Sequence, residues 1–176
     1  TLTMGRSVLM FASTVAVLER LVAAGADVSA RDGHGRSALV YATTYHVTSG
    51  LIAAQADVNA ADTEGNTPLM CAAENGDIES LEALLAAGAD ISARTSSGRT
   101  VLMFSATADV ARCALEAGVD PHATDENGNT ALLCVVEAGY IQLIHALVTA
   151  GVDIGVRNAD GDTALSLATA NDFGEV

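Results

Sequence analysis

Residues 65–93 read GNTPLMCAAENGDIESLEALLAAGADISA, and this stretch decides the fold. Thr67 and Pro68 open a short run of small and apolar residues, which suits a helix because proline is tolerated in the first turn. After Gly76, one apolar stripe predicts a second helix: Ile78, Leu81, Leu84 and Leu85. Gly88 lies where a helix commonly ends in the left-handed conformation. The stretch therefore predicts a helix, a turn, a second helix and a loop.

The same pattern recurs along the chain. Each copy begins at an anchor glycine, and successive anchors are 30, 30, 33, 30 and 33 residues apart: Gly5, Gly35, Gly65, Gly98, Gly128 and Gly161. The position that ends the second helix holds glycine in four copies and Gln55 in the second copy. Self-similarity of this kind predicts a repeat array in which each unit packs only against its neighbours.

In these residues the sequence resembles the ankyrin repeat family. The resemblance is carried by GNTPL at 65–69, GNTAL at 128–132, GDTAL at 161–165 and the GAD-like motifs that end the repeats. It implies an all-α repeat solenoid of stacked helix-turn-helix ankyrin repeats linked by β-hairpin loops, with 30- and 33-residue units alternating. The family's concave face usually binds another protein.

We expect residues 1–176 to form a single ankyrin-repeat domain, with five full repeats and a partial C-terminal repeat. Repeat arrays need polar capping units at both ends. The first helices are instead apolar, and the last repeat stops where its outer helix should begin. We therefore interpret the chain as a segment of a longer protein, or as one whose ends are covered by a partner.

Composition narrows the range of partners and locations. The formal net charge of −14 disfavours nucleic-acid and anionic-membrane binding, because phosphate contacts need clustered cations. No run of 18 apolar residues is present, so we expect no transmembrane helix and no membrane partner. The three cysteines lie in predicted helices and favour an intracellular, cytoplasmic setting. The oligomeric state is open.

All eight basic residues are arginine. A lysine-free chain lacks acceptors for ubiquitin, which would suit a secreted effector that acts inside a host cell. Codon bias in a GC-rich genome is the alternative, and it also explains the abundance of alanine and glycine.

No motif for catalysis, a cofactor or a metal is found. The four histidines do not pair with cysteine or with one another at zinc-ligand spacings. Residues 125–129 resemble a calcium loop only faintly, because the bidentate glutamate is absent. We therefore expect a protein that is not an enzyme and that has no cofactor-binding or metal site.

Two departures from the family pattern affect stability. In the second repeat, Gly50 lies within the predicted outer helix, and Gln55 replaces the terminal glycine, so we expect this repeat to be the least stable. The family's usual histidine, in T-P-L-H, is replaced throughout by other residues such as Met70 and Met103. Packing must then substitute for the polar pairing that this histidine makes in the family.

The hairpin tips predict one partner-binding surface. Arginines flank the anchor glycine in some repeats, while acids lie on the hairpins between them, so that basic and acidic tips alternate: Arg31, Arg36, Glu64, Arg94, Arg99 and Glu126. A charge-striped edge would select a partner and set its register. The alternative is ion pairing between neighbouring loops, which would order the loops but add little stability.

Repeat length predicts a second surface. Every 30-residue repeat has an aromatic residue six positions after the anchor glycine, whereas both complete 33-residue repeats have cysteine there: Phe11, Tyr41 and Phe104 against Cys71 and Cys134. The short repeats lack the three residues that end the inner helix of the long ones, almost one turn. We expect a notch at the fourth repeat, with Phe104 as its floor and Glu74, Asn75 and Glu137 as its walls. The alternative is that the ring of Phe104 is wholly buried packing.

The sequence therefore predicts a non-catalytic protein–protein interaction module. Its partner would be another protein or a basic peptide, bound through the concave face and the hairpin tips. The alternative function is a structural spacer or autoregulatory segment that packs against other domains of its own chain.

Overall fold

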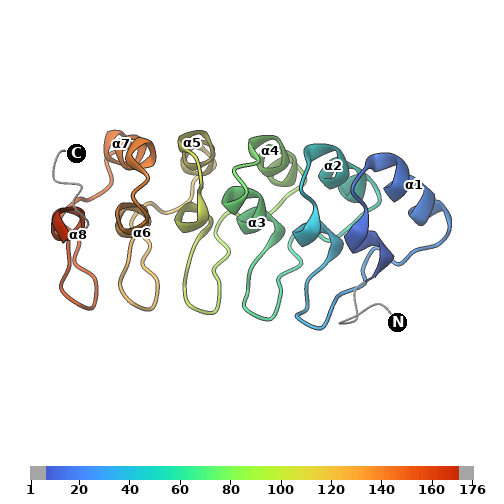
Figure 1. Ribbon diagram of the computed structural model, residues 1–176, viewed down its shortest axis with the longest axis horizontal. Coiled ribbons are helices and arrows are strands. Elements are labelled where there is room, and N and C mark those ends of the chain that lie inside the picture. The colour runs from blue at the N-terminus through green and yellow to red at the C-terminus, as the bar shows by residue number, and fades with distance from the viewer. Residues whose placement is uncertain (1–6, 171–176) are drawn as a thin grey trace. The chain divides into compact units, whose positions relative to one another are not determined.

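A computed structural model describes residues 7–170. The chain divides into two compact units, Thr1–Asp90 and Ile91–Val176. In each unit, inner and outer helices pair, and the loops that join successive pairs project from the side of the inner helices (Figure 1). The predicted all-α repeat fold is confirmed within each unit.

The first unit holds three inner and three outer helices among its described residues. The inner helices are the 3-10 helices η2 (Val8–Phe11) and η3 (Ala38–Tyr41) and the α-helix α3 (Pro68–Glu74). The outer helices are α1 (Val15–Ala23), α2 (Tyr45–Ala53) and α4 (Ile78–Ala86).

The second unit continues the alternation. Its inner helices are the 3-10 helix η4 (Val101–Phe104) and the α-helices α6 (Ala131–Ala138) and α8 (Ala164–Ala170). Its outer helices are α5 (Ala108–Glu116) and α7 (Ile141–Thr149). Residues 7–170 contain no β-strand, so the predicted β-hairpins are tight turns without a strand ladder.

The inner helices of the 30-residue repeats are shorter than those of the 33-residue repeats, as the sequence predicts. The short repeats have inner 3-10 helices of 4 residues, whereas the long repeats have inner α-helices of 7 and 8 residues. Thr67 caps α3 by accepting a hydrogen bond from the backbone N–H of Met70, and Pro68 occupies the first turn. The expectation that deletion of three residues removes nearly one turn is confirmed.

Apolar side chains fill the space between the helices of each unit. Leu18, Leu51 and Leu81 of the three outer helices are buried in the first unit. Met70 and Met103, which replace the family's histidine, are also buried, as are Met10 and Leu133 at equivalent positions. In these four repeats packing therefore substitutes for that histidine.

The second repeat departs from its neighbours at two positions. Gln55 ends α2 with a φ of 63°, a left-handed conformation in which an L side chain is strained. Gly50 lies in α2 where an added Cβ would come within 2.6 Å of Leu18 Cδ2 on α1. Gly50 therefore has a packing function that its helix propensity alone did not reveal.

One side-chain acceptor closes each described hairpin. It lies three residues before the anchor glycine, and in four hairpins its Oδ1 accepts two backbone N–H groups: Asp32, Asp62, Asp125 and Asn158. Thr95 holds the same place in the remaining hairpin, where its Oγ1 accepts from the backbone N–H of Arg99. The conformation of each loop is thus fixed by its own side chain.

Backbone bonds also join successive hairpins within a unit. The N–H of Thr63 donates to the carbonyl of His34 at 2.9 Å in the first unit. In the second unit, Glu126 donates to Ser97 at 2.8 Å and Ala159 donates to Asn127 at 2.8 Å. The hairpins are therefore tied to one another as well as closed internally.

Asp32 is a buried acceptor, with a side chain that is 1% exposed. Burial raises the pKa of Asp32, but hydrogen bonds from the Tyr41 hydroxyl at 2.5 Å and from the backbone N–H groups of Arg36 and His34 outweigh it, together with the charge of Arg36. The resulting pKa is about 2.

Replacement of Gln55 by glycine should stabilise the first unit. Gln55→Gly removes the strain of the left-handed residue, and the free energy of unfolding should rise by about 1 kcal/mol. Denaturant titration measures the change, and hydrogen exchange in α2, compared with α4, locates it. Gln55→Ala, which retains the strain, is the control. Equal stability of the two variants would contradict this account.

The Asp32 carboxylate should make stability depend on acid pH. Its folded pKa of about 2 lies below the ordinary value, so its contribution is present above pH 4 and is lost as the pH falls towards 2. Asp32→Asn should cost about 2 kcal/mol at neutral pH and flatten this dependence. Urea titrations from pH 6 to pH 2 test the expectation, and parallel curves for the two proteins would refute it. Tyr41→Phe removes one of the hydrogen bonds that lower the pKa of Asp32, so stability should be lost at a higher pH than in the wild type.

Candidate protein-interaction surface

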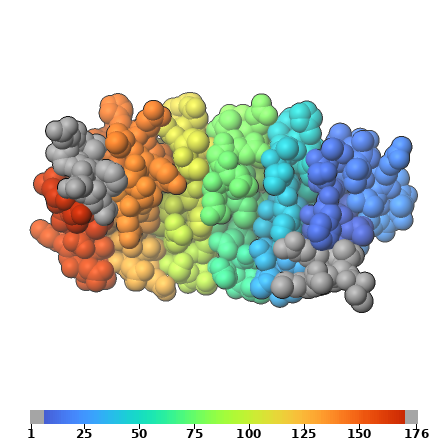
Figure 2. Space-filling model, in the orientation of Figure 1, coloured from blue at the N-terminus to red at the C-terminus, as the bar shows by residue number. Residues whose placement is uncertain are grey.

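The residues predicted to bind a partner are distributed over both units. Within each unit, successive repeats form adjacent bands of surface (Figure 2), so each hairpin and helix pair contributes its own strip. Some of the predicted residues are exposed: Phe11, Arg31, Glu64, Glu74, Asn75, Arg94, Glu126 and Glu137. Others are partly buried: Arg36, Tyr41, Arg99 and Phe104.

The arginines that lie four residues before the anchor glycine bind backbone carbonyls. Arg31 Nη1 donates to the carbonyl of Gly35 in its own hairpin at 2.9 Å and to that of Ala61 in the next at 2.6 Å. Arg94 Nη2 likewise donates to the carbonyl of Thr124. These side chains therefore connect neighbouring loops through the main chain.

Ion pairing between neighbouring loops, the alternative to a partner-selecting edge, is represented by Arg31 and Asp57. Their charged atoms are 3.9 Å apart and the side chains are 39% and 66% exposed, so the pair adds little stability. Neither Glu64 nor Glu126 forms an ion pair with another described residue. The acidic tips are thus not used to hold neighbouring basic tips.

The arginines that directly follow the anchor glycine lie over aromatic rings. The guanidinium carbon of Arg36 is 5.3 Å from the centroid of the Tyr41 ring, and that of Arg99 is 4.2 Å from the Phe104 ring. Both distances are within the range of a cation–π interaction. The two sets of residues, predicted separately as hairpin tips and as notch floor, are therefore one structural feature.

Sequence reasoning missed this pairing, although a signal for it was present. The three short repeats share arginine one residue after the anchor and an aromatic residue six after it, and Arg6 and Phe11 are the first such pair. The long repeats have asparagine and cysteine at these two places. Arg6 lies outside the described residues.

Phe104 as a residue is partly buried, which disfavours the alternative of wholly buried packing. Arg99 covers one face of the ring. Of the residues expected to form the walls, Glu137 belongs to the same unit as Phe104, whereas Glu74 and Asn75 belong to the first unit. The notch as a whole stays a prediction.

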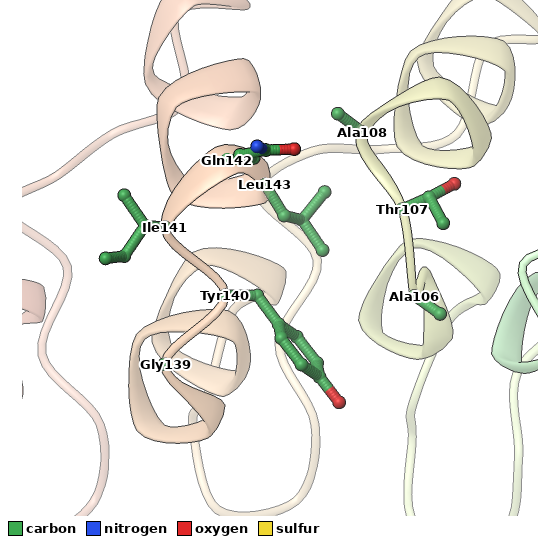
Figure 3. A pocket seen from close by; sticks show the side chains of 8 residues that line it. All are labelled: Ala106, Thr107, Ala108, Gly139, Tyr140, Ile141, Gln142 and Leu143. Carbon is green, nitrogen blue, oxygen red and sulfur yellow. The ribbon is translucent and has the colours of Figure 1, made fainter.

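A pocket of about 370 Å³ lies in the second unit, beside the short inner helix η4. It is lined by Ala106, Thr107 and Ala108 and by the turn between α6 and α7, residues 139–143. Tyr140 and Leu143 face the 106–108 segment, whereas Ile141 points away from it (Figure 3). Phe104 and Glu137 are not among the lining residues, so this pocket differs from the predicted notch.

Two cysteines occupy the aromatic position in the long repeats. Burial raises the pKa of Cys71 to about 11, with a further contribution from the charges of Glu74 and Asp62. Burial likewise raises the pKa of Cys134. Both thiols are therefore protonated at neutral pH and are weak nucleophiles.

Residues 7–170 contain neither a cluster of metal ligands nor a helix that could span a membrane. Among the described residues, no three or more His, Cys, Asp and Glu side chains gather as a metal site would require. None of the helices described is long and apolar enough to cross a membrane.

Comparison with known proteins agrees with the geometry. A family model for ankyrin repeats, in three copies, matches residues 9–95 and 102–176. The chain is also 42% identical over 57 residues to the ankyrin repeat-containing protein P1E11.10 of Schizosaccharomyces pombe. That alignment spans 32% of this chain and 28% of the yeast protein. The helix pairs, the closed hairpins and the match of the family model over most of the sequence together show that the chain belongs to the ankyrin repeat family.

Proposed function

We propose that this chain is a non-catalytic module that binds another protein through its inner helices and hairpin tips. Ankyrin repeats are generally protein–protein interaction modules. The finer assignment, to a particular face and to particular residues, is our inference from the geometry of the hairpins. The three cysteines favour a reducing, intracellular place of action.

The observation that carries the proposal is that the loops presenting the charged tips are closed by their own hydrogen bonds. Asp62 closes its hairpin by accepting from the N–H groups of Glu64 and Asn66, while the Glu64 side chain remains exposed. Asp125 closes the hairpin that carries the exposed side chain of Glu126. A surface fixed before binding loses less conformational entropy when a partner docks.

The tips of each unit present both signs of charge. In the first unit the hairpin of Arg31 is followed by that of Glu64, and in the second the hairpin of Arg94 is followed by that of Glu126. Rim charges of this kind act mainly on specificity and association rate. A partner with complementary acidic and basic groups would fit either unit.

A basic segment of the partner is proposed only for the acidic tips. The expectation of a basic side chain at Phe104 rested on an open ring with an acidic rim. Arg99 instead covers that ring, and a second cation placed there would be repelled. Glu64 and Glu126 remain the places where a basic group would bind.

Reversal of charge at the acidic tips should weaken partner binding without loss of stability. The test compares the wild-type chain with the double variant Glu64→Arg and Glu126→Arg, each immobilised and exposed to lysate, with quantification of the retained proteins. A matched control, Glu19→Arg with Glu82→Arg, makes the same change in net charge on the exposed faces of α1 and α4. Both variants should keep the wild-type melting temperature.

A specific partner should be retained by the wild type and the control but reduced at least about tenfold by the tip variant, as for the loss of about 1.4 kcal/mol. Retention that is equal on all three baits would contradict the assignment of the tips. Absence of any specific partner in trans would favour the spacer or autoregulatory function.

A further inference from the structure

The two arginine–aromatic pairs occupy equivalent positions but differ in one respect. In the first unit, Arg36 Nε lies 3.5 Å from Asp32 Oδ2, and the same oxygen accepts a hydrogen bond from the Tyr41 hydroxyl at 2.5 Å. The unit thus supplies a carboxylate of its own to the guanidinium that covers its aromatic ring. The charge of Arg36 is compensated inside the protein.

The second unit lacks that carboxylate. Thr95 stands where Asp32 stands in the first unit, and Phe104, which has no hydroxyl, replaces Tyr41. Thr95 Oγ1 is used by the backbone N–H of Arg99 and by Ser97 Oγ, which lies 3.0 Å away. Neither residue supplies a negative charge to Arg99.

Other acids near Arg99 do not fill this role. Arg99, Asp125 and Glu137 all influence the pKa of Cys134, so they lie in one neighbourhood. Asp125 Oδ1 accepts two backbone N–H groups of its own hairpin, and Glu137 is exposed. Within the described part of the chain, no carboxylate forms an ion pair with Arg99.

The orientation of Arg99 is nevertheless fixed. Its Nη2 donates to the carbonyl of Met103 at 3.1 Å, and its guanidinium lies over the Phe104 ring. Guanidinium groups carry five N–H donors and bind carboxylates through two parallel hydrogen bonds. A stacked, oriented guanidinium has already lost much of the side-chain freedom that a surface arginine would lose on binding.

We propose that Arg99, stacked on Phe104, is the subsite that receives a single aspartate or glutamate side chain of the partner protein. The partner's carboxylate supplies to the Arg99 guanidinium the negative charge that Asp32 supplies to Arg36. One carboxylate fits better than an acidic run, because the chain's net charge of −14 repels extended anions. This subsite rests on the proposed function and specifies the chemistry of the bound group.

The experiment uses the full chain and a defined probe, an acetylated and amidated Gly-Asp-Gly peptide. NMR of the arginine Nε–Hε groups should show a saturable shift of the Arg99 signal, with no comparable shift of Arg36, whose carboxylate partner is already present. The matched Gly-Asn-Gly peptide should shift neither. An Arg99 signal that responds equally to both peptides, or to neither, would overturn the subsite.

Thr95→Asp provides the second arm, because it gives the second unit the carboxylate that the first unit already has. This variant should keep its fold and weaken peptide binding at least about tenfold, the effect of losing one charge-assisted hydrogen bond. Arg99→Gln should do the same without an added acid. Unchanged peptide binding in both variants would overturn the proposal.

Failure of the subsite is distinguishable from failure of the proposed function. If a protein retained in the lysate experiment binds Thr95→Asp and the wild type equally, the subsite is wrong and the interaction module stands. If that protein is lost with Thr95→Asp but retained by Asp32→Asn, which changes the equivalent place in the first unit, the subsite is supported.

Discussion

The hydrogen bonds accepted by one side chain at the base of each hairpin determine the geometry of everything that projects from the loops. Loops have few buried apolar contacts, and their backbone N–H groups require partners. A single oxygen, such as Asp62 Oδ1 or Asp125 Oδ1, accepts two of these groups and closes the turn. The charged side chains at the tips are thereby held on a defined frame.

A carboxylate at the base of a hairpin can be buried only where hydrogen-bond donors surround it. The Asp32 side chain loses nearly all contact with solvent, and an ionised carboxylate there needs several donors to offset the lost hydration. Tyr41, the loop N–H groups and Arg36 provide them. In the second unit the equivalent acceptor is the neutral hydroxyl of Thr95, which needs fewer donors. The neighbouring Arg99 is then left without a carboxylate.

The helical repeat could be predicted from the sequence because it depends on local signals. Thr67, Pro68 and the periodic leucines each act within one helix, and the missing turn of the short repeats followed from counting residues between glycines. Contacts between repeats were harder. In the sequence Gly50 indicates only a weakness in α2, because its close approach to Leu18 of α1 joins residues 32 positions apart.

The sequence identifies residues of the candidate site but not the contacts between them. The arginines and the aromatic residues were both identified, but their stacking was not, because a spacing of five residues across a turn has no fixed geometry in sequence. The alternation of acidic and basic tips is a pattern of residues in the sequence. It could not reveal that Arg31 and Arg94 bind carbonyl oxygens of the next loop, since main-chain acceptors are identical in every sequence.

The use of main-chain acceptors between hairpins affects how such a chain can change in evolution. Arg31 contacts the carbonyl of Ala61, and the hairpins exchange main-chain hydrogen bonds, so neither kind of contact depends on the identity of the residue that supplies the acceptor. A duplicated, deleted or recombined repeat would meet the same acceptors in its new neighbour. The tips can then diverge in charge, repeat by repeat, without matching substitutions in the loop next door.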